Sequence, residues 1–188
     1  MPTVSHAAPW SQDGSAAPAA AVAVVHAQGP EESVLLIQRA RRRNDPWSGQ
    51  WSFPGGKRDP QDRDLLETAL RELQEECELR LLRDQCVATL EVMYAGRSAG
   101  RLVAVEPYLF RLPKAVSIQV NPAEATQALW LPLSILRDPS RHQLLEGPGI
   151  PSGWRVPGIP LGEVPLWGFT YRVLCAWLGI PILNQVSS

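Results

Sequence analysis

The sequence predicts an α/β fold in which helices pack against a mixed β-sheet. Apolar runs of strand length recur along the chain, and segments with helical spacing occur in the middle and near the C-terminus. Hydrophobic residues make up 45% of the 188 residues, which is enough for the core of one domain. We therefore expect a single domain over residues 19–188, preceded by a flexible leader rich in alanine and proline over residues 1–18.

The N-terminal third predicts a β-hairpin followed by a glycine turn. The run AAAVAVVHA (19–27) is typical of a buried strand, VLLIQRA (34–40) predicts a second strand, and GPEES lies close after the first as a turn. The segment RRRNDPWSGQ (41–50) is too polar and broken for regular structure. It leads to Gly55 and Gly56, where we expect a turn whose main-chain N–H groups a polyanion can approach closely.

The rest of the chain predicts two long helices separated by strands and a loop. Residues 64–77 form the clearest helix, with Asp64 as its N-cap and Glu67 completing a capping box. Residues 138–165 are rich in glycine and proline and predict a long functional loop. The final helix covers residues 168–179 and stops at Gly179. Its buried side is expected to carry Phe169, Val173, Ala176 and Trp177. Strands are expected at residues 86–95, 101–112 and 125–132, with a helical turn around residues 133–137.

Charge and composition argue against several classes of protein. The formal net charge of −1 gives no large basic surface for non-specific nucleic-acid binding. No apolar run reaches the roughly 18–20 residues of a membrane span, and the N-terminal stretch has no basic start, so we expect a cytoplasmic protein. Cys77, Cys86 and Cys175 follow no metal or disulfide spacing and are interpreted as core residues.

Three glutamates of the central helix share one narrow stripe beside its apolar face. At about 100° per residue, Glu75 and Glu76 fall on either side of Glu72. Like charges at this spacing destabilise a helix by roughly 0.2–0.5 kcal/mol, a cost that a bound Mg²⁺ would reverse. Taken alone, the stripe is also typical of a solvated face with ion pairs from Arg71 to Glu67 and Glu75.

The glycine pair and this helix together resemble the Nudix box, G-x5-E-x7-R-E-U-x-E-E-x-G-U, in which U is a bulky aliphatic residue. The run RELQEE (71–76) matches the R-E-U-x-E-E core, and Leu79 fills the last U. The segment between the glycines and this core is one residue longer than the pattern and lacks its early glutamate, a place for which Asp62 and Asp64 are both candidates. Glu78 replaces the box glycine, so the helix is expected to end differently.

This resemblance implies a Nudix-type α/β/α sandwich with a mixed β-sheet, and hydrolysis of a pyrophosphate linkage in a nucleoside diphosphate derivative with Mg²⁺ or Mn²⁺. The catalytic residues it implies are Arg71, Glu72, Glu75 and Glu76, the three glutamates as metal ligands and the arginine as the group that orients one carboxylate. The general base stays open between a box glutamate and a later carboxylate, such as Glu106 or Glu124. The alternative is a Nudix-fold module that binds a nucleotide without catalysis.

A second resemblance, to coenzyme A diphosphatases, spans nearly the whole predicted domain. LLIQRARRRNDPWSGQWSFPGG is similar to the segment before the box in these enzymes, and WGFTYR to their W-G-x-T-x-R element. The resemblance implies that coenzyme A or its thioesters are cleaved to 3′,5′-ADP, with 4′-phosphopantetheine or its acyl form as the other product. NADH, ADP-ribose, a sugar nucleotide and a (d)NTP are the alternatives.

The expected substrate contacts lie in and before the glycine pair, and they are Arg39, Arg43, Gly55 and Gly56. Guanidinium groups bind phosphates in a fixed fork geometry, although the run at residues 41–43 is equally typical of a solvated loop. Trp47, Trp51 and Trp154 are candidates for stacking on adenine, with core packing as the alternative. A homodimer is left open.

Overall fold

The computed structural model describes residues 17–43, 45, 47–96, 99–100 and 102–183. The leader expected over residues 1–18 therefore lies almost wholly outside the described residues, and it stays a prediction. The described part begins just before the first strand and contains every helix and strand discussed below.

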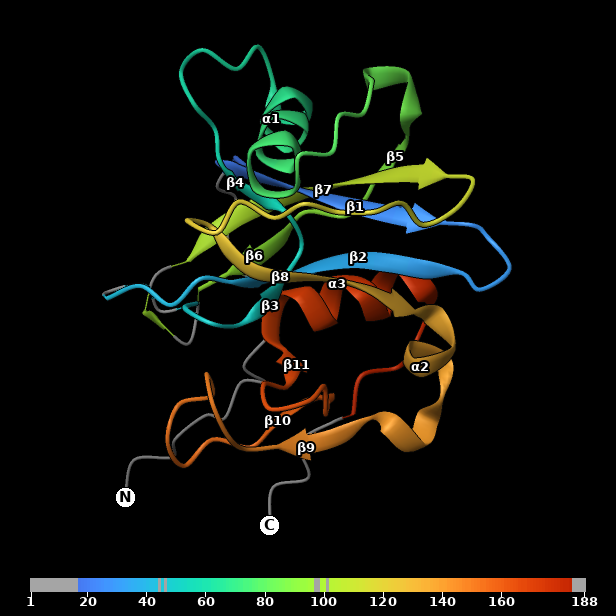
Figure 1. Ribbon diagram of the computed structural model, residues 1–188. Coiled ribbons are helices and arrows are strands. Elements are labelled where there is room, and N and C mark those ends of the chain that lie inside the picture. The colour runs from blue at the N-terminus through green and yellow to red at the C-terminus, as the bar shows by residue number, and fades with distance from the viewer. Residues whose placement is uncertain (1–16, 44, 46, 97–98, 101, 184–188) are drawn as a thin grey trace.

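Eight strands of the described residues form one mixed sheet (Figure 1). Its strand order is β3-β2-β1-β7-β5, with β4 also beside β1, β6 beside β7 and β8 beside β2. β1 and β7 run parallel, whereas β1 and β2 form the predicted antiparallel hairpin. The bounds are β1 Ala20–Ala27, β2 Ser33–Arg39, β3 Trp51–Ser52, β4 Gly55–Lys57, β5 Cys86–Thr89, β6 Met93–Ala95, β7 Val103–Leu112 and β8 Ala125–Pro132.

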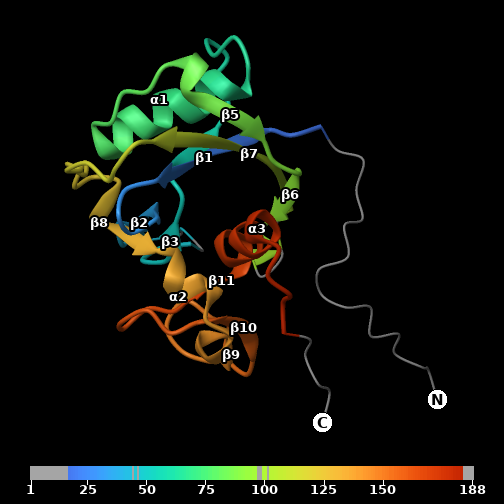
Figure 2. The same ribbon diagram turned by 90° about the vertical axis from the view of Figure 1, so that its right-hand side faces the viewer.

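Helices lie on both sides of this sheet, which confirms the predicted α/β sandwich (Figures 1 and 2). Helix α1 (Leu65–Cys77) covers one face, and α3 (Gly168–Leu178) covers the other. Successive residues of a strand point to opposite faces. Accordingly, Leu36 packs in the core on the α3 side and Leu35 in the core on the α1 side. Two-sided burial explains why the first strands are continuous apolar runs.

Helix α1 begins where the sequence predicts and ends in an unusual way. The side chain of Asp64 accepts a hydrogen bond from the N–H of Glu67 at 2.9 Å, which confirms it as the N-cap. The Glu67 carboxylate does not return to Asp64; it accepts from the N–H of Arg63 at 2.7 Å instead. At the other end, Glu78 adopts the left-handed conformation with φ 50°, and its N–H donates to the carbonyl oxygen of Gln74.

We expect Glu78→Gly to raise the free energy of unfolding by about 0.5–1 kcal/mol, because glycine adopts a left-handed conformation without the steric cost of a Cβ atom. Urea unfolding at pH 7 measures the change. Glu78→Ala is the matched control, since it removes the same carboxylate and keeps the Cβ atom. An equal gain in both variants would attribute the effect to charge rather than to backbone strain.

The segment expected to be a long loop contains part of a second sheet. β9 (Gln143–Leu145), β10 (Val156–Ile159) and β11 (Leu166–Trp167) pair antiparallel below α3 in Figure 1. Most of residues 138–165 lie outside strands, as predicted, but the short strands β9 and β10 were not expected. Strand β10 reads Val-Pro-Gly-Ile, and proline and glycine argue against a strand. A Cβ atom on Gly158 would lie 2.5 Å from the carbonyl oxygen of Leu166, so glycine permits the close pairing with β11.

Two other expectations need correction. The strand predicted over residues 86–95 is divided into β5 and β6, which both pair with β7. Helix α3 buries more of its surface than one stripe, because it lies between the large and the small sheet (Figure 1). Its buried residues are Thr170, Tyr171, Val173, Leu174 and Cys175. Ala176, which we expected on the buried side, is exposed.

The remaining elements agree with the sequence. Helix α2 (Leu133–Arg137) follows β8 as expected, and Gly179 ends α3 in the left-handed conformation. Cys77 and Cys175 are buried core residues, while Cys86 is half-buried. Across the ranges that the structure describes, no helix combines the length and the apolar character needed to cross a membrane.

Candidate active site

The two glycines lie in strand β4, directly between β1 and the carboxylates of α1. A Cβ atom on Gly56 would lie 2.3 Å from Oε1 of Glu72. One on Gly55 would lie 2.4 Å from the carbonyl oxygen of Ala21 in β1. Any larger residue would force these groups apart. The glycines therefore serve close approach to β1 and to the Glu72 carboxylate of α1, rather than the turn that we expected.

The three glutamates of the stripe have different environments. Glu76 is only 3% exposed, and Oε2 of its carboxylate accepts a hydrogen bond from the N–H of Gly55 at 2.8 Å. Burial raises the pKa of Glu76 to about 8. Burial also raises the pKa of Glu72, which is partly exposed, whereas Glu75 is exposed to solvent. The stripe thus runs from the core to the surface.

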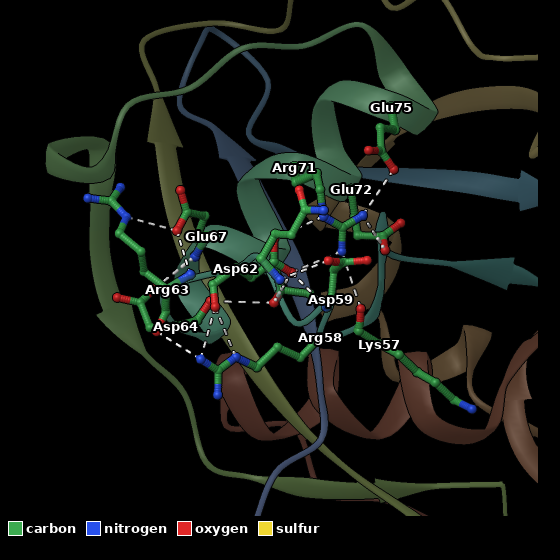
Figure 3. Close-up of polar contacts among 12 residues, drawn as sticks. Lys57, Arg58, Asp59, Asp62, Arg63, Asp64, Glu67, Arg71, Glu72 and Glu75 are labelled. Carbon is green, nitrogen blue, oxygen red and sulfur yellow. Dashed lines mark hydrogen bonds and ion pairs between the residues drawn. The ribbon is translucent and has the colours of Figure 1, made fainter.

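Arg71 joins two of these glutamates to Asp62 (Figure 3). Its Nε and Nη2 atoms donate to the two carboxylate oxygens of Asp62 at 3.0 and 3.1 Å. Its Nη1 atom donates to Glu72 at 2.9 Å and to Glu75 at 3.0 Å. The same guanidinium therefore holds the carboxylates of Glu72 and Glu75 near one another. The expected pair of Arg71 with Glu67 does not form, since Glu67 pairs with Arg63 at 2.9 Å.

Asp62, rather than Asp64, holds the arginine of the box. Asp62 is 5% exposed, and its carboxylate also accepts hydrogen bonds from the Thr68 hydroxyl at 2.8 Å and the Asp59 N–H at 2.9 Å. The hydrogen bonds from Arg71 lower the pKa of Asp62 to about 2. Asp64 instead caps α1 and pairs with Arg83 at 2.6 Å.

A cavity of about 410 Å³ opens beside β4 and α1. Its lining includes both glycines and the carboxylates of Glu72, Glu76 and Glu124, but not Glu75. Glu124 pairs with Arg42 at 2.8 Å. Glu106 lies outside the lining, and its carboxylate accepts a hydrogen bond from the Tyr108 hydroxyl. Only one of the two later carboxylates therefore faces the same space as the box glutamates.

The predicted substrate contacts are only partly brought together. Arg39 lines the cavity and pairs with Asp45 at 3.0 Å. Arg43 is exposed and lies outside the lining. The side chain of Arg41 lies near Gly49, at 3.7 Å from where a Cβ atom on that glycine would be.

Aromatic side chains form much of the remaining wall. Trp47, Trp51 and Trp154, all considered from sequence, line the cavity. Tyr94 and Arg172 line the cavity too, and neither was expected as a site residue. Nη2 of Arg172 donates to the carbonyl oxygen of Tyr94 at 2.5 Å. Arg172 is the last residue of the WGFTYR element, which was the available signal.

The acidic side chains do not form a closed ligand set. Among the residues that the structure describes, no three His, Cys, Asp or Glu side chains are gathered so that they could together hold a metal ion. Glu72 and Glu76 line the cavity, whereas Glu75 does not, although Arg71 binds both Glu72 and Glu75.

Comparison with known proteins defines the class to which this fold and site belong. The NUDIX domain matches residues 17–148, and the chain belongs to the Nudix hydrolase family. It is 30% identical over 145 residues to the uncharacterized Nudix hydrolase NudL of Photorhabdus laumondii, covering 77% of this chain and 75% of that protein.

Two further matches are narrower. The mouse mitochondrial coenzyme A diphosphatase NUDT8 is 39% identical over 67 residues, which cover 36% of this chain and 32% of that protein. The NUDIX domain of Shewanella oneidensis NrtR, solved with ADP ribose, has a TM-score of 0.53 and 26% identity; the match covers 67% of this chain and 80% of that one.

Proposed function

We propose that this protein hydrolyses a pyrophosphate linkage in a nucleoside diphosphate derivative, with coenzyme A or its thioesters as the preferred substrate. The observation that carries the proposal is the meeting of Glu72, Glu76 and the two glycines on one wall of a cavity. Carboxylates suit divalent cations, and the remaining aromatic wall suits the organic part of a nucleotide.

The oxygen ligands that a hard divalent cation prefers are present at Glu72 and Glu76 on the cavity wall, and Glu75 would have to turn toward them to complete the set. Burial raises the pKa of both Glu72 and Glu76, so negative charge there is poorly stabilised until a cation approaches. Arg71 keeps Glu75 beside Glu72 through one shared nitrogen. Glu72, Glu75 and Glu76 would hold Mg²⁺ or Mn²⁺. The chemistry supplied by such an ion is neutralisation of the pyrophosphate oxygens and activation of a water molecule.

The residues of this chain supply orientation and substrate binding. Arg71, fixed by both oxygens of Asp62, limits the movement of the Glu72 carboxylate. Arg39 lines the cavity within reach of a phosphate group, which its guanidinium can bind in a bidentate manner. Glu124 shares the cavity with the box glutamates and is a better candidate base than Glu106.

Coenzyme A is preferred over other nucleotides because of its 3′-phosphate. The arginines at residues 41–43 are exposed, and Arg42 pairs with Glu124, which lines the cavity. An additional phosphate near this run would gain a charge-assisted hydrogen bond. The partial identity with a coenzyme A diphosphatase supports the same substrate.

A metal-by-substrate screen tests the proposal. We expect coenzyme A to give a higher kcat/KM with Mg²⁺ or Mn²⁺ than NADH, ADP-ribose or a sugar nucleotide. Coenzyme A should also exceed dephospho-coenzyme A by about 10-fold, since one hydrogen bond to a charged group contributes roughly 1.5 kcal/mol. Arg42→Gln should remove this last difference, because Arg42 pairs with the lining residue Glu124, whereas Arg111→Gln, an exposed arginine outside the cavity lining, should preserve it. A kcat/KM for ADP-ribose above that for coenzyme A would make ADP-ribose the preferred substrate. Absence of turnover with every compound would favour a module that binds a nucleotide without catalysis.

A further inference from the structure

Trp154 differs from the other tryptophans of the cavity in its exposure. Trp51 and Trp167 also line the cavity, but each is 8% exposed and packed into the fold, and Trp47, the fourth tryptophan of the lining, is partly buried. Trp154 is 42% exposed. An indole combines a large flat apolar surface with low conformational freedom, which makes it an effective contact for a planar ligand. Its role in packing the core is small.

The loop that carries Trp154 is fixed to the wall of the cavity. It joins β9 to β10, and an ion pair of 3.3 Å between Arg155 and Glu146 links its two ends. In its middle, the carbonyl oxygen of Gly149 accepts a hydrogen bond from Nε2 of Gln50 at 3.1 Å. Gln50 lines the cavity immediately before Trp51. The loop therefore holds Trp154 at a defined place in this wall.

Three glycines of the same loop have positive φ angles, which glycine adopts more easily than other residues. Gly147, Gly149 and Gly153 have φ of 134°, 80° and 79°. A Cβ atom on Gly147 or Gly153 would meet no atom within 4 Å, so packing does not require glycine there. The left-handed conformations themselves favour it. They allow the chain to fold back and present the indole just before β10 begins at Val156.

The chemistry of the cavity indicates which part of a ligand Trp154 meets. The carboxylates and glycines occupy the wall formed by α1 and β4, while Trp154 belongs to the β9–β10 segment of the second sheet. A ligand whose pyrophosphate lies at the carboxylates must extend its organic groups toward other walls. A nucleobase is the flat aromatic group of such a ligand, and stacking on an aromatic side chain tolerates any base.

We propose that Trp154 is a specificity-determining residue that stacks on the nucleobase of the substrate. This inference rests on the proposed function, because it assumes that a nucleotide occupies the cavity. It predicts that affinity for the nucleotide half of a ligand depends on an aromatic ring at position 154, while affinity for a base-free half does not.

Calorimetric binding of two ligands tests the stacking without any need for turnover. We expect Trp154→Ala to weaken binding of adenosine 3′,5′-bisphosphate by about 10-fold, within the range measured for base–aromatic stacking. Trp154→Phe should retain most of the affinity, because it keeps a ring. Binding of 4′-phosphopantetheine, which has no base, should be unchanged. Leu82→Ala is the matched control, since Leu82 is 67% exposed and lies outside the cavity lining.

Several results would overturn the inference. Equal weakening of both ligands would indicate a distorted cavity, and unchanged binding in Trp154→Ala would show that no stack forms. Failure of the wild-type protein to bind the adenosine ligand would also refute it. Hydrolysis of coenzyme A by the wild-type protein is measured separately. If the wild type hydrolyses coenzyme A but Trp154→Ala binds adenosine 3′,5′-bisphosphate normally, only the stacking is rejected. If Trp154→Ala weakens that binding but the wild type hydrolyses nothing, only the enzymatic function is rejected.

Discussion

Glu76→Gln should reduce kcat on the order of 10³-fold, the largest effect on activity that we expect from a single substitution. Glutamine preserves the size of the side chain and can still accept the hydrogen bond from Gly55. It removes the charge with which Glu76 would hold a divalent ion, and such ions contribute several kcal/mol to stabilisation of the transition state. Steady-state kinetics at saturating Mg²⁺ measure the loss.

The same substitution should raise the free energy of unfolding of the metal-free protein at pH 8. Burial raises the pKa of Glu76 to about 8, above its ordinary value of 4.5. Between these values the folded state binds more protons than the unfolded state, so stability falls as the pH rises. Glu76→Gln has no such titration. We therefore expect the variant to unfold at a higher urea concentration than the wild type at pH 8, with the difference shrinking toward pH 5.

Divalent ions should make the wild type more stable than Glu76→Gln. Mg²⁺ or Mn²⁺ that binds only the folded protein stabilises it by mass action, and the wild type should gain more than the variant. Glu67→Gln serves as the control, because Glu67 lies on the same helix, pairs with Arg63 and is outside the cavity lining. Wild-type activity in Glu76→Gln, or equal metal stabilisation of both proteins, would contradict a ligand role for Glu76.

The sequence predicts the parts of the site that lie close together along the chain. Periodicity locates α1, and the spacing of Glu72, Glu75 and Glu76 places them on one stripe that the structure confirms. Periodicity does not say how deeply each residue is buried. Glu76 is buried because β4 and its Gly55 N–H lie against α1, a contact between residues 21 positions apart.

Other features depend on contacts that no local pattern reveals. Strand β10 forms despite its proline and glycine, because β9 and β11 pair on either side of it. Trp154 reaches the cavity from the loop before β10, about 100 residues after the glycines of β4 that contact the glutamates. The choice between Asp62 and Asp64 was closer to being predictable. Five residues separate Gly56 from Asp62, as in the box pattern, so the extra residue falls after the acid.

Asp62→Asn should produce the largest loss of stability, about 2–4 kcal/mol in the free energy of unfolding at pH 7. Breaking a buried ion pair leaves the remaining charge without its partner, and this costs more than the pair itself contributes. Arg71 would keep its contacts to Glu72 and Glu75, but the asparagine oxygen can accept only one of its two hydrogen bonds at position 62, and the amide nitrogen faces the other donor. Urea unfolding measures the change, and Asp84→Asn, an exposed aspartate outside the cavity, is the matched control.

The pH dependence of this loss follows from the pKa of Asp62, which Arg71 lowers from 3.8 to about 2. A lowered pKa means that the folded state binds fewer protons, so the stabilisation is complete above pH 4 and disappears as the pH falls toward 2. The difference between wild type and Asp62→Asn should shrink over that window. Activity should fall about 10–100-fold as well, because Arg71 is itself held less firmly and therefore positions Glu72 less well. A full stability loss with unchanged kcat would mean that Asp62 supports the fold without positioning the site.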